Sequence, residues 1–452
     1  MRGAEPGLVC ATCSGFCIAG PLEPMKEQLN RINRRGFLRK LGAAGFGSAF
    51  AFAAVNGDSK ESKGVSDVNT VEDAEDRTFG PPKRKFGQEG IKVPCRGLGT
   101  NRLSMGNRVV LKKAYEYGVT LWDTSTAYIG GQGERCIGEF VQKNPDARAK
   151  LFIVSKATEA VGIEQKERLL QMSLRRMNLQ YIDLYLGVHQ MDEPSNLNDE
   201  LQRWAEAKKK KKQIRYLGFS THKNMTRCLE AAARLDWIDV VMTSYNFRLM
   251  QDKRFNAAIE ACREAGIGII AIKTQGHGVN SPEDAWQKRY SISSERDREL
   301  TRHLLEKGYT QGQAKIKLVL ENKCITSACV GLTNLSFLDA NVAAVMDRKE
   351  LSPEDKRRFK DYAQATCSGY CAGCAYICDG VLPGPAYVSD IMRYLMYYNS
   401  YGEKGLARKL FAAIPEGVRS RMPDADYGAA EALCPQRLAI GELVAEAVSK
   451  LS

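Results

Sequence analysis

The feature that most constrains this chain is a regular alternation of short apolar segments with amphipathic stretches, between about residues 86 and 348. Apolar runs of about four to eight residues are typical of buried strands. The eight segments are RGLGT from Arg96, VTLWDT from Val119, LFIVSK from Leu151, DLYLGVH from Asp183, RYLGFS from Arg215, DVVMTS from Asp239, GIIAIK from Gly268 and SACVG from Ser327. Eight strands separated by helices predict an α/β fold, a parallel (β/α)8 TIM barrel.

The length and composition fit a soluble barrel enzyme with an appendage. A chain of 452 residues has room for such a barrel and a further helical region, and 44% apolar with 26% charged residues is typical of a globular protein. The net charge of +13 is spread along the chain, so no nucleic-acid partner is predicted. We expect four regions: an N-terminal extension with an export signal (1–57), a linker (58–84), the barrel (85–348) and a cysteine-rich helical tail (349–452).

The N-terminal region contains the motif NRRGFLRK, followed by an uncharged segment over residues 41–57. An arginine pair before a mildly apolar Gly/Ala-rich run is typical of a twin-arginine export signal, and Ala51, Phe52 and Ala53 offer a cleavage site. The sequence therefore predicts export to the periplasm or cell envelope by the twin-arginine machinery. An uncleaved membrane anchor is the main alternative, and Met25 is an alternative start.

Four cysteines occur close together in the tail, in the segment CSGYCAGCAYIC: Cys367, Cys371, Cys374 and Cys378. Short gaps let one loop bring several thiolates to a compact metal centre. None of the four histidines of the chain is nearby, which excludes a local Cys/His zinc finger. A 4Fe-4S cluster or an all-cysteine zinc site remains, and the spacing favours the cluster. Disulfides are less favoured, because gaps this short strain their geometry.

Four polar residues lie where a barrel places its active site. Asp123, Lys156 and His189 end the second, third and fourth predicted strands, and Tyr128 follows the second. Here the sequence resembles the aldo/keto reductase family over residues 86 to about 345. The matching segments are FGQEGIKVPCRGLGT, GVTLWDTSTAYIGGQGERCIGEF, FIVSK, YIDLYLGVH, IRYLGFSTH and SYN.

The resemblance implies a catalytic tetrad. Tyr128 is expected to protonate the substrate carbonyl, and Lys156 to supply the positive charge that favours its phenolate. Asp123 is expected to hold the lysine ammonium, and His189 to donate a hydrogen bond that orients the carbonyl. The reaction implied is the interconversion of a carbonyl and an alcohol, on a small-molecule carbonyl or sugar-like substrate.

The resemblance also implies binding of NAD(P)(H), with departures from the family pattern. Ser220, Thr221, Gly331 and Asn341 are the expected cofactor-binding residues. Met242 occupies the position of a strand-6 glutamine, and Ile272 and Lys273 occupy that of a strand-7 aromatic residue. No arginine for a 2′-phosphate occurs in GLTNLSFLDAN.

The cysteine-rich region resembles the ferredoxin-like tail of one branch of bacterial aldo/keto reductases. The first gap, from Cys367 to Cys371, is one residue longer than usual, and a further candidate precedes a proline at Cys434. We expect the compact four cysteines as ligands, with Cys434 in reserve, and electron transfer through the cluster to a partner. The alternative function is a redox-sensing or ligand-binding module with a structural metal site.

Overall fold

The computed structural model describes residues 80–87, 90–158, 160–279, 295–331, 334–347 and 349–452. All of them belong to one compact unit, residues 69–452. The predicted export signal and residues 58–79 of the predicted linker lie outside the described residues. Within the described part of the chain, no helix is both long and apolar enough to span a membrane.

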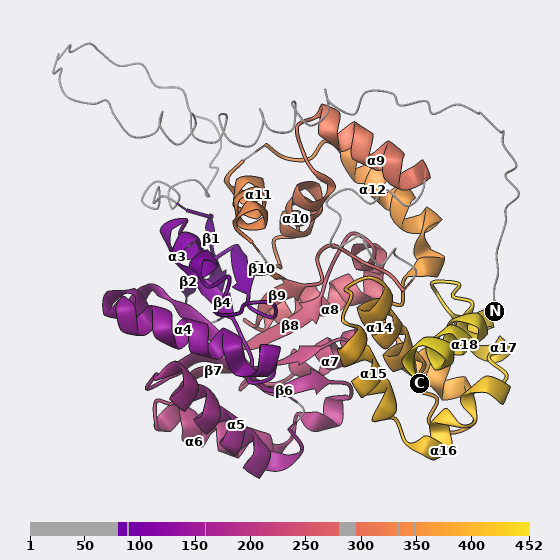
Figure 1. Ribbon diagram of the computed structural model, residues 1–452, viewed down its shortest axis with the longest axis horizontal. Helices are drawn as coiled ribbons and strands as arrows, with labels where there is room; N and C mark the ends of the chain where they lie inside the picture. Colours follow the sequence, from indigo (N-terminus) through magenta and orange to yellow (C-terminus); the bar gives the residue numbers. More distant parts are fainter. Residues whose placement is uncertain (1–79, 88–89, 159, 280–294, 332–333, 348) are drawn as a thin grey trace, which may run out of the picture. The chain divides into compact units, whose positions relative to one another are not determined.

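Eight parallel strands close into a barrel in the order β10-β3-β4-β5-β6-β7-β8-β9 (Figure 1). Each of the eight predicted segments forms one strand, which confirms the predicted fold class. The strands are β3 (Arg96–Gly99), β4 (Leu121–Asp123), β5 (Phe152–Thr158), β6 (Ile182–Met191), β7 (Ile214–Thr221), β8 (Val240–Ser244), β9 (Gly268–Ile272) and β10 (Ser327–Gly331).

Amphipathic helices follow the strands because each presents one apolar face to the barrel. In α5 the buried residues Leu170, Leu174 and Met177 recur at helical spacing, and the helix ends at Asn178 in the left-handed conformation. The barrel helices are α3 (Val109–Glu116), α4 (Gln132–Lys143), α5 (Gly162–Met177), α6 (Asp199–Lys210), α7 (Met225–Ala232), α8 (Lys253–Glu264), α9 (Glu295–Glu306), α10 (Gln311–Glu321) and α11 (Leu335–Met346).

An antiparallel hairpin, β1 (Lys83–Phe86) with β2 (Ile91–Pro94), packs against the N-terminal ends of the barrel strands. Phe86 is only 1% exposed and shares a core with Leu121 and Val154 of the barrel interior. Its ring meets that of Phe152 edge to face, with 4.9 Å between ring centroids. This end of the barrel is therefore closed, and ligands must enter at the opposite end.

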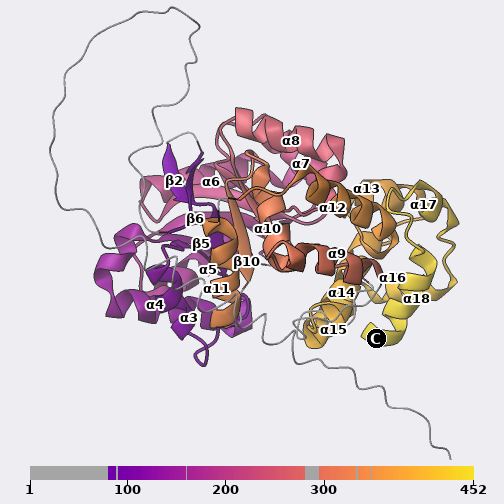
Figure 2. The ribbon, with the colours of Figure 1, turned by 90° about the horizontal axis from the view of Figure 1, so that it is seen from above.

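The tail forms a helical group with its own apolar core, in which Ile391, Leu395, Phe411 and Val444 are buried. Helices α14 to α18 lie together in both views (Figures 1 and 2). The tail helices are α12 (Pro353–Ala365), α13 (Ala375–Cys378), α14 (Val388–Asn399), α15 (Lys404–Ala412), α16 (Glu416–Arg419), α17 (Gly428–Leu433) and α18 (Ile440–Leu451).

Polar contacts attach the tail to loops that follow the C-terminal ends of three barrel strands. After β7, the Asn224 backbone N–H donates to Gly373 O at 2.7 Å. After β8, Arg248 donates to Thr366 O at 2.8 Å. After β9, Val279 O accepts from the Asn399 side chain at 2.8 Å. The tail therefore covers part of the end of the barrel where a TIM barrel places its chemistry.

Candidate active site

Asp123 and Lys156 form a buried ion pair at the ends of β4 and β5. The Lys156 ammonium donates to Asp123 Oδ1 and, at 2.8 Å, to the backbone oxygen of Thr124. Lys156 is 1% exposed and Asp123 is 4% exposed. Burial alone would lower the pKa of Lys156, but the neighbouring Asp123 and Tyr128 raise it above its usual value. The lysine therefore carries a positive charge inside the barrel mouth.

Tyr128 begins the short 3-10 helix Tyr128–Gly131 that follows β4. Its ring centroid lies 4.7 Å from Lys156 Nζ. Burial raises the pKa of Tyr128 to about 12, although the positive charge of Lys156 acts in the opposite direction. The phenol therefore keeps its proton near neutral pH, and burial outweighs the phenolate-favouring effect that the sequence led us to expect from the lysine.

His189 lies on β6 opposite Thr158 of β5, close enough for the charge of Lys156 to act on it. Its Nδ1 is hydrogen-bonded to Ser220 Oγ, and no partner of Nε2 is found in the described residues. Burial lowers the pKa of His189 to about 3, with further lowering by the positive charges of Lys156, Arg393 and Lys273. A neutral imidazole that receives the serine proton at Nδ1 has an N–H at Nε2 to donate. The structure thus brings all four predicted tetrad residues together.

The two predicted amide-binding residues at the end of β7 are engaged within the protein. Ser220 Oγ is bonded to His189, and Thr221 Oγ1 donates to Lys223 O at 2.9 Å. Met242 is 1% exposed and belongs to the barrel core. Lys273, in the expected place of an aromatic residue, follows β9 directly. The contacts that the family makes with a nicotinamide ring are therefore altered in this chain.

The other two predicted cofactor residues lie at the β10–α11 connection. Gly331 ends β10, and a Cβ added there would lie 2.5 Å from Asn101 Oδ1. Asn341 is largely buried on α11, with 8% exposure. The first turn of this twelve-residue helix is capped by Asn334, whose side chain accepts from Phe337 N. The backbone N–H groups of a helix N-terminus suit a phosphate.

The cysteine loop, residues 367–378, lies against the loop after β7. Gly373 adopts a φ of +75°, and a Cβ at this position would clash with His222 O. The Gly373 N–H donates to Cys371 Sγ at 3.4 Å. Only glycine combines this backbone conformation with so close an approach, so Gly373 fixes the position of the loop on the barrel.

The structure groups the candidate metal ligands differently from the sequence, with Cys434 in the group and Cys367 outside it. Burial raises the pKa of the Cys371 thiol well above its usual value, and the nearby Cys374, Cys378 and Cys434 contribute in the same direction. Cys434, at the end of α17, therefore lies near three of the predicted four. Cys367 instead lies near Arg248. Within the described ranges, no three Cys, His, Asp or Glu side chains are arranged closely enough to hold a metal ion.

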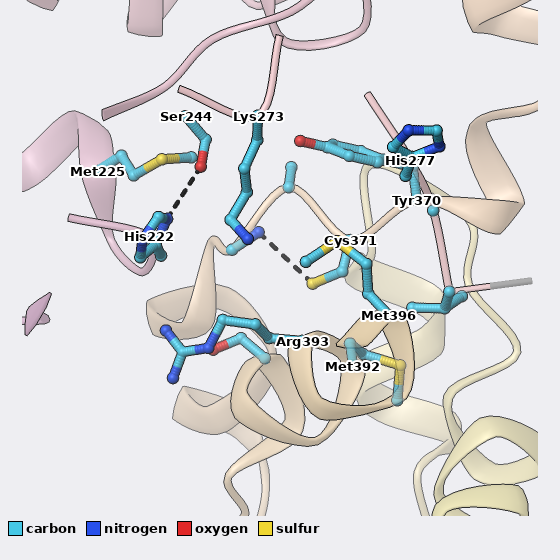
Figure 3. A pocket seen from close by; sticks show the side chains of 15 residues that line it. His222, Met225, Ser244, Lys273, His277, Tyr370, Cys371, Met392, Arg393 and Met396 are labelled. Atoms are coloured by element: carbon cyan, nitrogen blue, oxygen red, sulfur yellow. Dashed lines mark hydrogen bonds between the residues drawn. The ribbon is translucent and has the colours of Figure 1, made fainter. Parts of the chain in front are cut away.

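The sequence analysis assigned no function to four polar residues near the tetrad: His222, Lys273, Arg393 and Tyr397. The first three line a pocket between the barrel mouth and the tail (Figure 3). His222 Nδ1 is hydrogen-bonded to Ser244 Oγ at 3.0 Å. Tyr397 interacts with Lys273 and with Gln190, the residue after His189. A signal existed for Lys273, which replaces an aromatic residue, but none for the two tail residues.

A family model described as "Aldo/keto reductase family" matches residues 97–363. An aldo-keto reductase of Gibberella moniliformis is 30% identical over 219 residues, which cover 43% of this chain and 64% of the relative. Aldo-keto reductase yakc of Schizosaccharomyces pombe, whose name includes NADP(+), is 29% identical over 231 residues, 45% of this chain and 65% of the relative. The matched region thus spans slightly less than two thirds of these relatives.

Among solved structures, the holo form of an aldo-keto reductase from Bacillus halodurans has a TM-score of 0.51 and 20% identity. The similarity covers 62% of this chain and 95% of that structure, which shows that the barrel fold is shared. The family match covers more than half of this chain and includes the strands that carry Asp123, Lys156 and His189. The chain belongs to the aldo/keto reductase family.

Proposed function

We propose that the protein is an oxidoreductase that interconverts a small-molecule carbonyl and an alcohol. The observation that supports this most directly is the buried Asp123–Lys156 pair beneath a protonated Tyr128. Together with the neutral His189, these side chains meet at the open end of the barrel. Both groups that contact the carbonyl oxygen can then donate hydrogen bonds at neutral pH.

The chain's own residues account for the proton step of reduction. Tyr128 Oη gives its proton to the carbonyl oxygen as that oxygen becomes negative. The Lys156 charge stabilises the phenolate that forms, and Asp123 keeps the ammonium in place. His189 Nε2–H donates to the same oxygen and fixes its position. In the direction of alcohol oxidation, the same groups accept the proton.

We infer that a nicotinamide nucleotide, NAD(P)(H), is the hydride carrier, as the family and the name of the yeast relative suggest. Its phosphates would bind near the N-terminus of α11, whose backbone N–H groups suit a phosphate. Asn341 lies on the same helix. Ser220 and Thr221 would hold the ring amide once their hydroxyls exchange partners. When bound, this cofactor supplies the hydride.

We also propose a 4Fe-4S cluster in the tail, held by Cys371, Cys374, Cys378 and Cys434, with Cys434 in place of Cys367. The mutual influence of these thiols and the Gly373 N–H directed at Cys371 Sγ support this donor set. All-thiolate coordination suits such a cluster and also zinc. When bound, a cluster would supply one-electron transfer to a partner.

A matched pair of variants tests the proposed ligands. Cys434→Ser is expected to lose iron and the broad brown absorption of anaerobically purified protein, whereas Cys367→Ser keeps both. If only Cys367→Ser loses iron, the cluster ligands are instead the four cysteines expected from the sequence, Cys367, Cys371, Cys374 and Cys378. Zinc without iron in the parent protein would make the tail a structural metal site.

We propose that the protein works in the periplasm or cell envelope after twin-arginine export, on the basis of the NRRGFLRK motif. Arg34→Lys with Arg35→Lys should trap the protein in the cytoplasm, because this route requires the arginine pair. Cell fractionation of the parent and the double variant measures this. An unchanged distribution would contradict the assignment.

The tetrad is tested by Tyr128→Phe, with Tyr115→Phe on α3 as a matched loss of a phenol hydroxyl outside the site. Reduction of a panel of aldehydes, ketones and sugars, with NADPH, NADH or dithionite as reductant, should fall by about 10²–10⁴-fold only in Tyr128→Phe. If the parent turns over no substrate and Tyr128→Phe still binds ligand, the chain is a sensing or binding module.

A further inference from the structure

The pocket in Figure 3 is composite, because the barrel and the tail each supply part of its wall. Its cavity volume is about 40 Å³. His222, Ser244 and Lys273 line it from the ends of β7, β8 and β9, and the cysteine loop and α14 line it from the tail. No single element could form this pocket, so its chemistry depends on residues more than 100 positions apart in sequence.

One face of α14 points into the pocket. Ser389, Met392, Arg393 and Met396 all line it, at the spacing that places residues on one side of a helix. The two methionines give this face an apolar part, and Ser389 and Arg393 give it a polar part. A ligand on this face would meet both, as is usual for small-molecule sites.

Lys273 enters from the opposite wall. Its ammonium lies 4.7 Å from the ring centroid of Tyr397 and 5.2 Å from that of Tyr401. No carboxylate pairs with it in the part of the chain that the structure describes. Burial lowers the pKa of Lys273, although the Tyr397 phenol, to which it is hydrogen-bonded, acts in the opposite direction.

Arg393 and Ser389 hold polar atoms that have no partner. Arg393 donates to Asp390 at 2.6 Å through one terminal nitrogen, but its buried Nε makes no hydrogen bond. The hydroxyl of Ser389, a residue only 6% exposed, also makes none. Buried polar groups are rarely left unpaired. Two such groups therefore lie on α14, the helix that lines the pocket.

Nearby acids do not neutralise the pocket. Asp390 is shared between Arg393 and Lys223, which is 3.0 Å away. Arg393 and Lys223 act on the pKa of Asp192, but Asp192 does not line the pocket. The positive charges of Lys273 and Arg393 both act on His189 of the tetrad. A group held between them would therefore lie close to the carbonyl position.

We propose that this pocket binds an anionic group of the substrate, a carboxylate or a phosphate, between Lys273 and Arg393. The substrate class is then a small anionic carbonyl or alcohol, such as an oxo acid, a sugar acid or a sugar phosphate. The assignment of this ligand as the substrate rests on the proposed oxidoreductase function. A neutral nicotinamide ring in the same place would bring no negative charge to Lys273, which has no carboxylate partner in the described residues.

The test measures binding without turnover, in the Tyr128→Phe protein. Thermal unfolding is followed with increasing pyruvate, inorganic phosphate or pyruvamide, the last being a neutral analogue of pyruvate. The inference predicts a rise in Tm with pyruvate, phosphate or both, and none with pyruvamide. The two anions separate carboxylate from phosphate recognition.

Charge variants in the same background identify the residues. Lys273→Met and Arg393→Gln should each raise the anion concentration for half-maximal stabilisation by about tenfold or more. Lys223→Gln removes a cation that shares Asp390 with Arg393 but does not line the pocket, and should leave that concentration unchanged. A Lys273→Met protein that unfolds at the parent temperature without anion shows that the fold is intact.

Three results would overturn the inference: no stabilisation by either anion, equal stabilisation by pyruvamide, or anion binding unaffected by both charge variants. Displacement of the anion by NADP+ would place the dinucleotide in this pocket and would also overturn it. The binding assay needs no turnover, so it tests the pocket separately from the reaction. If the protein binds anions but reduces no carbonyl, the proposed function is contradicted and the anion pocket is not.

Discussion

The candidate active site combines one buried charged pair with two side chains that are kept neutral. Asp123 and Lys156 neutralise each other, while burial keeps the proton on Tyr128 and keeps a second proton off His189. Burial acts on all four residues: it raises the pKa of Asp123 and Tyr128 and lowers that of His189, whereas for Lys156 the neighbouring Asp123 and Tyr128 outweigh burial. This explains why neighbouring groups differ in charge.

The buried pair makes Lys156→Met a severe change. Removing the lysine leaves the Asp123 carboxylate without its partner, so we expect the free energy of unfolding to fall by about 3–5 kcal/mol. Urea denaturation measures this. Adding Asp123→Asn to the same protein should recover part of the loss. A single variant as stable as the parent would contradict the ion pair.

The histidines of the barrel mouth predict a pH dependence of stability. Burial lowers the pKa of His189 and His277 to about 3, and that of His222 well below 6.5. Below pH 6.5 the unfolded chain binds protons that the folded chain does not, so stability is complete above this pH and is lost towards pH 3. Each histidine contributes up to about 1.4 kcal/mol per pH unit.

Urea midpoints between pH 7 and pH 4 measure this slope, and His222→Asn should reduce it. A slope that does not change in this variant would contradict the contribution of His222 to the acid destabilisation.

Among the elements, those that the sequence predicted best are the buried ones. Each barrel strand is an apolar run whose inner and outer faces are both covered, so it stands out against the helices. The β1–β2 hairpin was missed because its strands KRKF and IKVP are only four residues long, KRKF is mostly charged, and they contribute only Phe86 and Val93 to the buried core. The polar face of α14 was missed because its role depends on the barrel beside it.

The contact of the cysteine loop with the barrel, at Gly373, can be tested by substitution. Gly373→Ala would force a clash with His222 O and strain a φ of +75°. We expect a lower Tm and faster hydrogen exchange in α14. Gly369→Ala is the matched control, because no atom lies within 4 Å of its added Cβ. Equal effects of both changes would show that the close approach of Gly373 is unimportant.

For the whole molecule, the tail is part of the site rather than a separate module. It covers part of the open end of the barrel, supplies Arg393 and Tyr397 and places the cysteine loop beside His222. The tetrad could be predicted from strand ends because the barrel topology fixes where they meet. The composite pocket could not, since it depends on contacts between Lys273 and residues more than 100 positions later.

The measurement that tests the central claim most directly is isotope transfer from deuterated NADPH, labelled at C4 of the nicotinamide, to a carbonyl substrate panel. Mass spectrometry of the products from full-length protein should detect alcohol with deuterium on the former carbonyl carbon. The yield should fall by about 10²-fold or more in Tyr128→Phe and stay unchanged in Tyr115→Phe. Equal deuterated yields from parent and Tyr128→Phe, or none from the parent, would contradict tetrad-dependent carbonyl reduction.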